Sequence, residues 1–305
     1  MLSLIQTALE LGLIYGFTVL ALFLSYSMLG VCDLSTDGCF TLGATVGAMV
    51  ALAGHPLLSL PAAMLSGMAS GLVTSLLQTR LGIDSLLSGI IVNTGLYSVN
   101  IAVMAGAAQV SLNRTDTLFT MVRDLLKGAP LAGAYRLVLL LPLSVLTVAL
   151  LSLFLGTRLG LSIRATGDNP DMVRASSIDP RFTTTVGLCL SGSLTGLSGC
   201  LLAQYQRSAE VNIGSGVLTV ALASLLIGRV LVSRGSIPLK AAGAVAGAFL
   251  FRLIYALALQ LKMPAYMLKL TSAVIVALTI ALPYLKKKYA PKTARGMRKG
   301  GKTPC

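Results

Sequence analysis

The chain is poor in the residues that most often build catalytic and metal sites. It has one histidine, five cysteines and ten acidic residues among 305 positions. The histidine, His55, precedes Pro56 in a loop, where a catalytic base is not expected. The cysteines lack the paired spacing of metal ligands and are interpreted as small buried thiols. The sequence carries no phosphate-binding glycine loop, zinc-protease helix or nucleophile elbow. We therefore expect no enzymatic activity, no metal and no cofactor in this chain.

Charge is also scarce, at 11% of residues, and tryptophan is absent. Hydrophobic residues make up 55% of the chain and the mean hydropathy is +0.85. This composition excludes an ordinary soluble domain and indicates a multi-pass helical membrane protein. A membrane-spanning helix needs roughly 20 apolar residues, so the length accommodates about eight to ten spans. The 31 glycines favour closely packed helices.

Nine apolar segments predict an all-α, polytopic membrane protein with about nine spans. The segments are 8–28, 34–53, 57–79, 84–106, 135–156, 182–204, 215–232, 238–260 and 264–283. The second and the seventh each begin at a break rich in Gly and Ser, which predicts broken or re-entrant helices; a re-entrant second segment lowers the count to eight. With nine spans these two segments run in opposite directions. They therefore predict an inverted repeat, an arrangement that places a pathway between two halves of a transporter.

The net charge of +14 is concentrated beside the predicted spans rather than spread over a surface. Nine spans with the N-terminus outside bring most basic residues to the cytoplasmic side, as the positive-inside rule requires. The cytoplasmic groups are Arg80, the segment 158–181, Arg229, Arg234, Lys240 and the tail 286–305. We interpret residues 1–285 as a single transmembrane domain and 286–305 as a basic cytoplasmic tail that contacts anionic lipid. A nucleic-acid partner is not expected.

A polar, turn-rich stretch interrupts the apolar sequence at about 157–181. Its Gly-Asp-Asn-Pro run is expected to end one helix, and Pro170 is well placed to begin a short one. Such a helix would lie outside the bilayer and meet a soluble partner. The candidate coupling residues are Arg164, Gly167, Asp168, Asn169, Pro170, Asp171, Met172 and Arg174.

A second polar group marks the start of the second apolar segment. Asp33 and Asp37 are four residues apart and share one face if the segment is helical there. They either cap a helix N-terminus, with Ser35 and Thr36 helping, or line a substrate pathway. Two asparagines in the fourth segment, Asn93 and Asn100, either form hydrogen bonds between helices or line the same pathway.

One arginine, Arg252, falls in the middle of the eighth segment. An isolated charge there costs roughly 2.5 kcal/mol or more, so the side chain is expected to face the protein interior or a wet cavity. A structural pair with an acid or a carbonyl and a role in the substrate pathway both stay open. The available acids are Glu10, Asp33 and Asp37, although Glu10 is interpreted as lying at the membrane interface. The sequence does not choose among them.

Several stretches together resemble one transporter family. Residues 159–174, LGLSIRATGDNPDMVR, resemble the coupling loop of ABC importer permeases of the branched-chain amino-acid and ribose type. Residues 33–44, DLSTDGCFTLGA, resemble the DLTVDGSFTLGA pattern of a branch associated with tryptophan and tyrosine uptake. Residues 79–90 and 96–100 match the same branch. The resemblance extends over about 8–285.

Three positions of the DLSTDGCFTLGA stretch depart from the branch pattern. Ser35 and Thr36 stand where the branch has Thr and Val, and Cys39 stands where it has Ser. The departures are small polar or apolar exchanges that leave the class intact and leave the substrate open.

The resemblance implies a subunit of a larger assembly in a bacterial cytoplasmic membrane. That assembly pairs two permease copies, expected to form a homodimer, with a dimer of cytoplasmic ATPases and an extracytoplasmic substrate-binding lipoprotein. ATP and Mg²⁺ are bound by the ATPase, and alternating access moves an amino acid inward, with aromatic amino acids among the candidates. Two other hypotheses stay open at this point. One is a sugar or nucleoside permease of the same family, and the other is an ion-coupled secondary transporter with Asp33, Asp37 and Arg252 as its relay.

Overall fold

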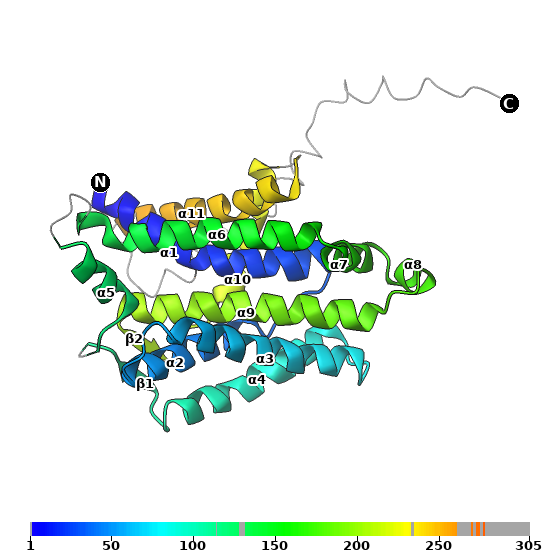
Figure 1. Ribbon diagram of the computed structural model, residues 1–305, viewed down its shortest axis with the longest axis horizontal. Helices are drawn as coiled ribbons and strands as arrows, with labels where there is room; N and C mark the ends of the chain where they lie inside the picture. The colour runs from blue at the N-terminus through cyan, green and yellow to red at the C-terminus, as the bar shows by residue number, and fades with distance from the viewer. Residues whose placement is uncertain are drawn as a thin grey trace, which may run out of the picture.

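The protein is built almost wholly from helices (Figure 1). The computed structural model describes residues 2–113, 115–127, 132–232 and 235–260, together with 270, 273, 274 and 277. The α-helices are α1 Leu2–Leu22, α2 Thr36–Leu52, α3 Ser59–Thr79, α4 Ser85–Val103, α5 Leu118–Leu125, α6 Tyr135–Gly156, α7 Arg158–Asp168, α8 Pro170–Ala175, α9 Pro180–Gln206, α10 Val217–Leu231 and α11 Ile237–Gln260. The remaining elements are the π-helix η1 Phe23–Met28, the 3-10 helix η2 Ala132–Ala134 and the strands β1 Gln109–Ser111 and β2 Ser208–Glu210.

Eight of the nine apolar segments coincide with helices. Within the described residues, six helices are long and apolar enough to cross a membrane: α1 with η1, α3, α4, α6, α9 and α11. The second and seventh segments form α2 and α10, which are apolar but only 17 and 15 residues long. The all-α, polytopic class is thus confirmed. The ninth segment, 264–283, and the tail 286–305 lie almost wholly outside the described residues, so the count of about nine stays a prediction.

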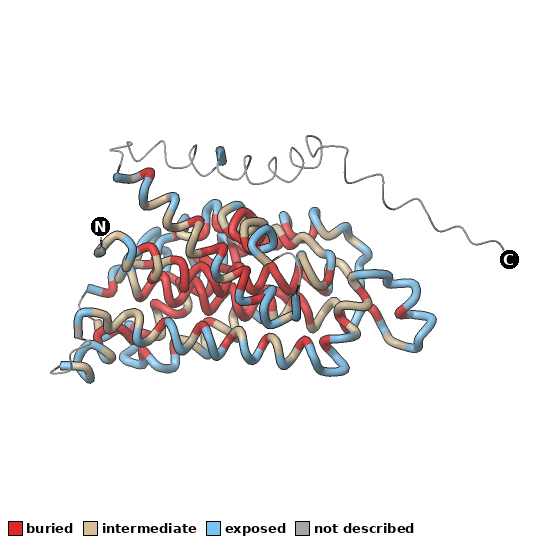
Figure 2. Tube along the Cα trace, turned by 90° about the horizontal axis from the view of Figure 1, so that it is seen from above, coloured by how far each residue is buried: buried red, intermediate tan, exposed pale blue. Residues whose placement is uncertain are grey.

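Figure 2 shows the buried residues gathered in the interior of the bundle, and α1 and α9 are the most buried of its long helices. In each of them 83% of the apolar window is buried, whereas the other four long helices are 22–33% buried. Glycine makes this central packing possible in α9. Gly192 and Gly196 lie directly against the backbone of Gly67 and Ala63 in α3, and Gly196 also meets Gly43 of α2. Backbones approach this closely where side chains are absent. In a membrane such close packing drives helix association, because the hydrophobic effect between helices is lost in lipid.

The packing of the two ends of the chain follows one pattern. Helix α1 packs on α10 and α11, while α9 packs on α2 and α3; α2 packs on α3, and α10 packs on α11. The two halves also run in opposite directions, because Glu10 near the start of α1 bonds to Tyr205 near the end of α9. Helices α1, α2 and α3 therefore have the same packing relations as α9, α10 and α11, in the opposite direction. This correspondence supports the predicted inverted repeat.

The basic loops gather at one end of the bundle, where α7 and α8 project (Figure 1). Helix α3 ends there and α9 and α11 begin there, since each long helix runs antiparallel to its partner. Arg80, Arg181, Arg229 and Lys240 belong to the loops and helix ends of that side. The positive-inside rule makes this end cytoplasmic.

The opposite end carries the long loop between α4 and α6. It forms the short helix α5, held by a capping box in which Thr117 and Thr120 bond each other's backbone. Gln204 of α9 accepts a 2.9 Å bond from the Leu118 amide and ties α5 to the bundle. The loop also contributes β1, which pairs antiparallel with β2. These three-residue strands depart from the all-α prediction, because they are too short to show an alternating pattern.

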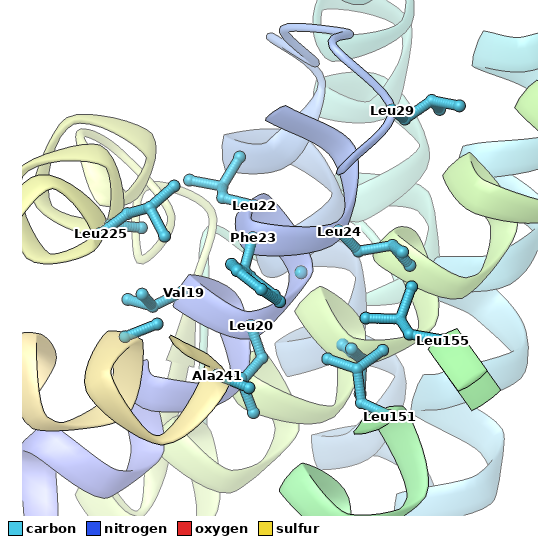
Figure 3. Packing of buried hydrophobic residues seen from close by; sticks show 14 of the residues in the cluster. Val19, Leu20, Leu22, Phe23, Leu24, Leu29, Leu151, Leu155, Leu225 and Ala241 are labelled. Atoms are coloured by element: carbon cyan, nitrogen blue, oxygen red, sulfur yellow. The ribbon is translucent and has the colours of Figure 1, made fainter. Parts of the chain in front are cut away.

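The end of α1 is wound as a π-helix, a feature that the apolar pattern does not reveal. Its first residue, Phe23, is only 2% exposed. Figure 3 shows the ring between Leu225 of α10 and Ala241 of α11 on one side and Leu151 and Leu155 of α6 on the other. Single π-turns inside α-helices are frequent at functional sites. Here the π-turn leads directly into the segment that carries Asp33.

Close glycine packing yields a matched pair of variants. A methyl group added at Gly67 meets the backbone of Gly192, so Gly67→Ala is expected to cost about 1–3 kcal/mol of stability and to lower the melting temperature in detergent. Gly95 of α4 has nothing within 4 Å of such a methyl. Gly95→Ala is therefore expected to be neutral or to stabilise by up to about 1 kcal/mol through helix propensity. Equal melting temperatures for the two variants would contradict the packing argument.

Candidate functional site

The polar stretch forms two helices joined at a sharp corner. Helix α7 ends at Asp168, and the Asn169 side chain accepts bonds of 3.1 Å from the amides of Asp171 and Met172. Pro170 occupies the first position of α8, where its missing N–H costs nothing. The predicted helix stop and the Pro-initiated short helix are both confirmed.

The outward face of α8 is exposed. Met172 is 64% exposed, and the side chains of Asp171 and Arg174 are 85% and 63% exposed. These two charges form a 3.1 Å ion pair across one turn, which stabilises little in water. Asp168, Asn169 and Pro170 are exposed as well, whereas Arg164 and Gly167 are partly buried. The projecting helix therefore presents an apolar Met172 flanked by opposite charges on an exposed surface.

The opposite face of this element is anchored to the bundle by residues that sequence analysis missed. Val173 is 2% exposed and Ile163 is fully buried. The Thr166 hydroxyl lies 2.8 Å from the Thr183 hydroxyl at the start of α9. The sequence offered no clear signal for this anchor, because Leu159 and Leu161 in the same stretch are exposed although they are equally apolar. The buried Ile163 and Val173 fix α7 and α8 to the bundle.

Gly167 places α7 against the segment that follows the π-helix. Its backbone packs on that of Met28 and Leu29. Gly30 lies opposite, with φ of +73°, a left-handed conformation that favours glycine. A side chain at 167 would collide with this backbone, so the contact depends on glycine. Segment 29–35 thereby connects the coupling element to the start of α2.

Asp33 fixes the turn that begins α2. Its carboxylate accepts a 2.8 Å bond from the Ser35 amide and a 2.6 Å bond from the Ser35 hydroxyl, and its carbonyl accepts a 2.8 Å bond from the Thr36 hydroxyl. Thr74 of α3 donates to Ser35 at 3.3 Å. Asp33 precedes the helix, so the prediction that it shares a helical face with Asp37 is wrong. The turn needs residues 33–35 outside the helix to bring the carboxylate back onto Ser35.

Asp37 caps a different helix from its own. Its carboxylate oxygens accept bonds of 3.0 Å from the Gly216 amide and 2.7 Å from the Leu218 amide, at the start of α10. The Gly214 amide donates to Thr41 at 3.2 Å beside it. The interpretation of Asp37 as a helix cap is confirmed, but the capped helix is α10, which begins 180 residues further along the chain. The two short helices therefore meet at their N-termini, joined by one carboxylate.

This meeting point lies deep within the bundle. The Cys39 thiol approaches the Gly192 carbonyl at 3.4 Å, and Gly192 is the thirteenth residue of α9. At 1.5 Å per residue it lies about 18 Å from the cytoplasmic start of that helix. The half-helix N-termini of a transporter occupy this depth, where their partial positive charge faces the pathway.

Helix α4 covers the start of α2 with both asparagines. Asn100 donates a 3.3 Å bond to the Gly38 carbonyl, and its own amide oxygen is buried without a partner. A Cβ on Gly38 would lie 2.7 Å from the Asn93 amide oxygen. The interhelical hydrogen bond is confirmed for Asn100. The pathway role of Asp33, Ser35, Thr36, Asp37, Asn93 and Asn100 stays a prediction; of these six, Asp37 and Asn93 are partly exposed and the others are buried.

Glu10 is buried within the protein, beside the start of α6 and the end of α9, and its position at the membrane interface stays a prediction. It is 2% exposed and accepts bonds from Gln6 at 3.1 Å, Tyr205 at 3.0 Å and Arg136 at 3.4 Å. Arg136 also lies over the Tyr205 ring at 4.6 Å. The group of partners neutralises the charge inside the protein, so burial is tolerated.

Arg252 faces the protein as predicted, but the described residues provide neither the acid nor the carbonyl partner that was predicted. The guanidinium carbon lies 3.6 Å from the centre of the Tyr15 ring and 5.6 Å from that of Tyr255. Among the described residues it forms neither a hydrogen bond nor an ion pair, and its Nε is buried without a partner. Glu10, Asp33 and Asp37 are all engaged elsewhere. A desolvated cation–π contact of about 2 kcal/mol takes the place of the ion pair.

The geometry and the sequence together define a permease subunit: a multi-pass helical bundle with inverted halves and an exposed polar element, α7 and α8, at its basic end. Residues 4–283 match the family described as the permease component of branched-chain amino acid transport systems, and the chain belongs to it.

Curated relatives agree with this assignment. The chain is 31% identical to the tyrosine transport system permease protein of Clostridioides difficile, over 92% of this chain and 94% of the relative. It is 28% identical to the probable branched-chain amino acid transport permease LivH of Methanocaldococcus jannaschii, over 66% and 58%. It is 40% identical to the D-allose permease AlsC of Escherichia coli, over 27% and 26%. No solved structure is significantly similar to the chain.

The two intramembrane arginines should respond oppositely to loss of charge. Arg136→Leu strands the buried Glu10 carboxylate and is expected to cost roughly 1–3 kcal/mol. Arg252→Leu removes a cation that has no ion pair, so its melting temperature in detergent should stay near that of the parent or rise. A larger loss for Arg252→Leu than for Arg136→Leu would show that Arg252 has a structural partner after all.

The cap across the two short helices is testable by hydrogen exchange. Asp37→Ala leaves the amides of Gly216 and Leu218 without an acceptor and should cost about 1–2 kcal/mol. Peptides covering the start of α10 are expected to exchange faster, whereas those of α3 should not change. Asp116→Ala is the control, because Asp116 is exposed and makes no contact of this kind among the described residues. Unchanged exchange at the start of α10 would refute the cap.

Proposed function

We propose that the protein is the membrane subunit of an ATP-driven importer of amino acids, with aromatic amino acids as the favoured substrates. The observation that carries the proposal is α8: an exposed helix at the basic end, anchored by Val173, in a chain of this permease family. The substrate class is supported by the tyrosine permease that aligns with nearly the whole chain.

In this proposal the eight coupling residues receive the motion of a partner ATPase. ATP and Mg²⁺ bind to that ATPase dimer, whose closure displaces α8. Gly167 presses on the backbone of Met28 and Leu29, so the displacement reaches segment 29–35 and the start of α2. Asp37 then carries it to α10. Only contacts that differ between two states transmit such motion, and the α2–α10 junction is the bistable element.

The assembly in this proposal contains two copies of this chain as a homodimer, the ATPase dimer on α8, and an extracytoplasmic binding lipoprotein at the end that carries α5. The binding protein supplies most of the selectivity for the substrate. Asp37 and Asn93, the partly exposed members of the α2 junction, would reach the pathway, while Asp33, Ser35 and Asn100 hold them in place.

Two alternatives differ in substrate or energy source. A sugar or nucleoside permease is favoured by the match to the D-allose permease, which covers about a quarter of the chain. An ion-coupled transporter would need a relay through Asp33, Asp37 and Arg252. The geometry speaks against the relay, because both carboxylates are bonded to backbone amides and Arg252 stacks on Tyr15.

The coupling role of α8 predicts an uncoupled double variant. Asp171→Arg with Met172→Asp reverses the charge and removes the apolar contact on the exposed face while leaving Val173 in place. We expect at least about a tenfold loss of amino-acid uptake in membrane vesicles, with loss of ATPase co-purification and an unchanged detergent melting curve.

The matched control places the same changes at the opposite end. Met121→Asp with Asp124→Arg makes the same two exchanges at exposed positions three residues apart on another short helix, α5. This control should retain ATPase co-purification. Normal uptake by the α8 double variant, or loss of the ATPase from the α5 variant alone, would overturn the coupling role.

A further inference from the structure

A cavity of about 390 Å³ lies between α1, α10 and α11. Its polar lining comes from Tyr15 of α1, from Ser215 and Thr219 at the start of α10, and from Arg252 and Tyr255 of α11. Arg252 is the fifteenth residue beyond the start of α11, about 22 Å from the cytoplasmic end. Arg252 therefore lies well away from the cytoplasmic lipid headgroups, and Ala273 completes the described lining of the cavity.

Among the described residues that line the cavity, Arg252 is the only charged side chain. The described lining therefore holds one cation and no anion. Asp37 binds the amides of Gly216 and Leu218 nearby, but it makes no ion pair with Arg252. A buried charge without a counter-ion costs free energy that a folded protein normally avoids. The cost is offset when a ligand supplies the opposite charge.

The guanidinium is held in a defined orientation. Tyr15 stacks on it at 3.6 Å and Tyr255 approaches at 5.6 Å, which fixes the plane of the group without using its N–H donors. Nε is buried and without a partner. A planar fork of free donors matches the two oxygens of a carboxylate. Ser215 and Thr219 are exposed to the cavity and form no side-chain hydrogen bond among the described residues, so their hydroxyls are free to bind the same ligand.

We propose that this cavity is a binding site for the carboxylate of the transported solute, with Arg252 as the residue that recognises it. The proposal rests on the proposed function for the identity of the solute as an amino acid. The permease would then select solutes by charge, in addition to any selection by a binding protein. The carboxylate of an amino acid pairs with Arg252, whereas a neutral sugar has no group that does so.

The test measures the electrostatic preference of the cavity by cysteine labelling. In the assembled transporter, Cys32, Cys39, Cys189, Cys200 and Cys305 are replaced and Ser215→Cys is introduced, with Arg252 or with Arg252→Gln. Thiol reaction rates are compared for an anionic and a cationic methanethiosulfonate of similar size, MTSES and MTSET. With Arg252 the anionic reagent should be favoured by about tenfold relative to the cationic one, and Arg252→Gln should abolish this preference.

Protection by small molecules then identifies the ligand chemistry. L-Tyrosine at millimolar concentration should slow labelling of Ser215→Cys in the Arg252 protein, whereas tyramine, which lacks the carboxylate, should not. Arg252→Lys should retain partial protection, since it keeps the charge and loses the fork. Equal rates for the two reagents with Arg252 present, or equal protection by tyramine, would overturn the proposal.

The proposed function is judged separately, by uptake of labelled L-tyrosine into vesicles carrying the native chain. If uptake is absent while the reagent preference and its loss in Arg252→Gln are present, the anion site stands and the substrate assignment fails. If uptake is present and the preference is absent, the function stands and the site fails. Arg136→Gln serves as the structural control, because its charge is paired with Glu10 and should leave the labelling preference unchanged.

Discussion

Close contact between backbones on α9 is the constraint on which the rest of the structure depends. Apolar side chains gain little by moving from lipid to a protein interior, so helices in a membrane associate by packing and hydrogen bonding. In α9, Gly192 and Gly196 bring the backbones of α2 and α3 against the helix axis. Ser198 adds a hydrogen bond to the Ile14 carbonyl of α1. Central helices packed this tightly provide a rigid frame, and the short helices are positioned against it.

The two short helices, α2 and α10, are held against this frame. Helices α2 and α10 begin inside the bundle and run to opposite sides, and Asp37 satisfies the amides that a buried helix start leaves open. The Asp37 carboxylate therefore caps a buried helix start and also connects the two halves of the bundle. On one side of this junction lies the path to α8 through Gly167 and segment 29–35. On the other side lies the cavity of Arg252.

Much of the fold was predictable because membrane helices have a strong local signal. Eight apolar segments became helices close to their predicted bounds, and the Pro170 helix start followed from turn chemistry alone. The partners of charged groups were not predictable. Arg252 stacks on Tyr15 instead of meeting an acid, and Asp37 caps a helix distant in sequence, because both contacts depend on the way the halves cross. The π-turn at Phe23 left no mark in hydropathy, since it changes winding and not composition.

The two-stranded ladder between β1 and β2 has a consequence for the geometry of any outward opening. It joins the end of α4 to the end of α9, through residue pairs such as Val110 with Ala209. Peptide hydrogen bonds of this kind resist separation of the two ends yet permit a small twist. Within one subunit these two helix ends are therefore held together. In the proposed homodimer, an outward passage would then form along the boundary between the two copies.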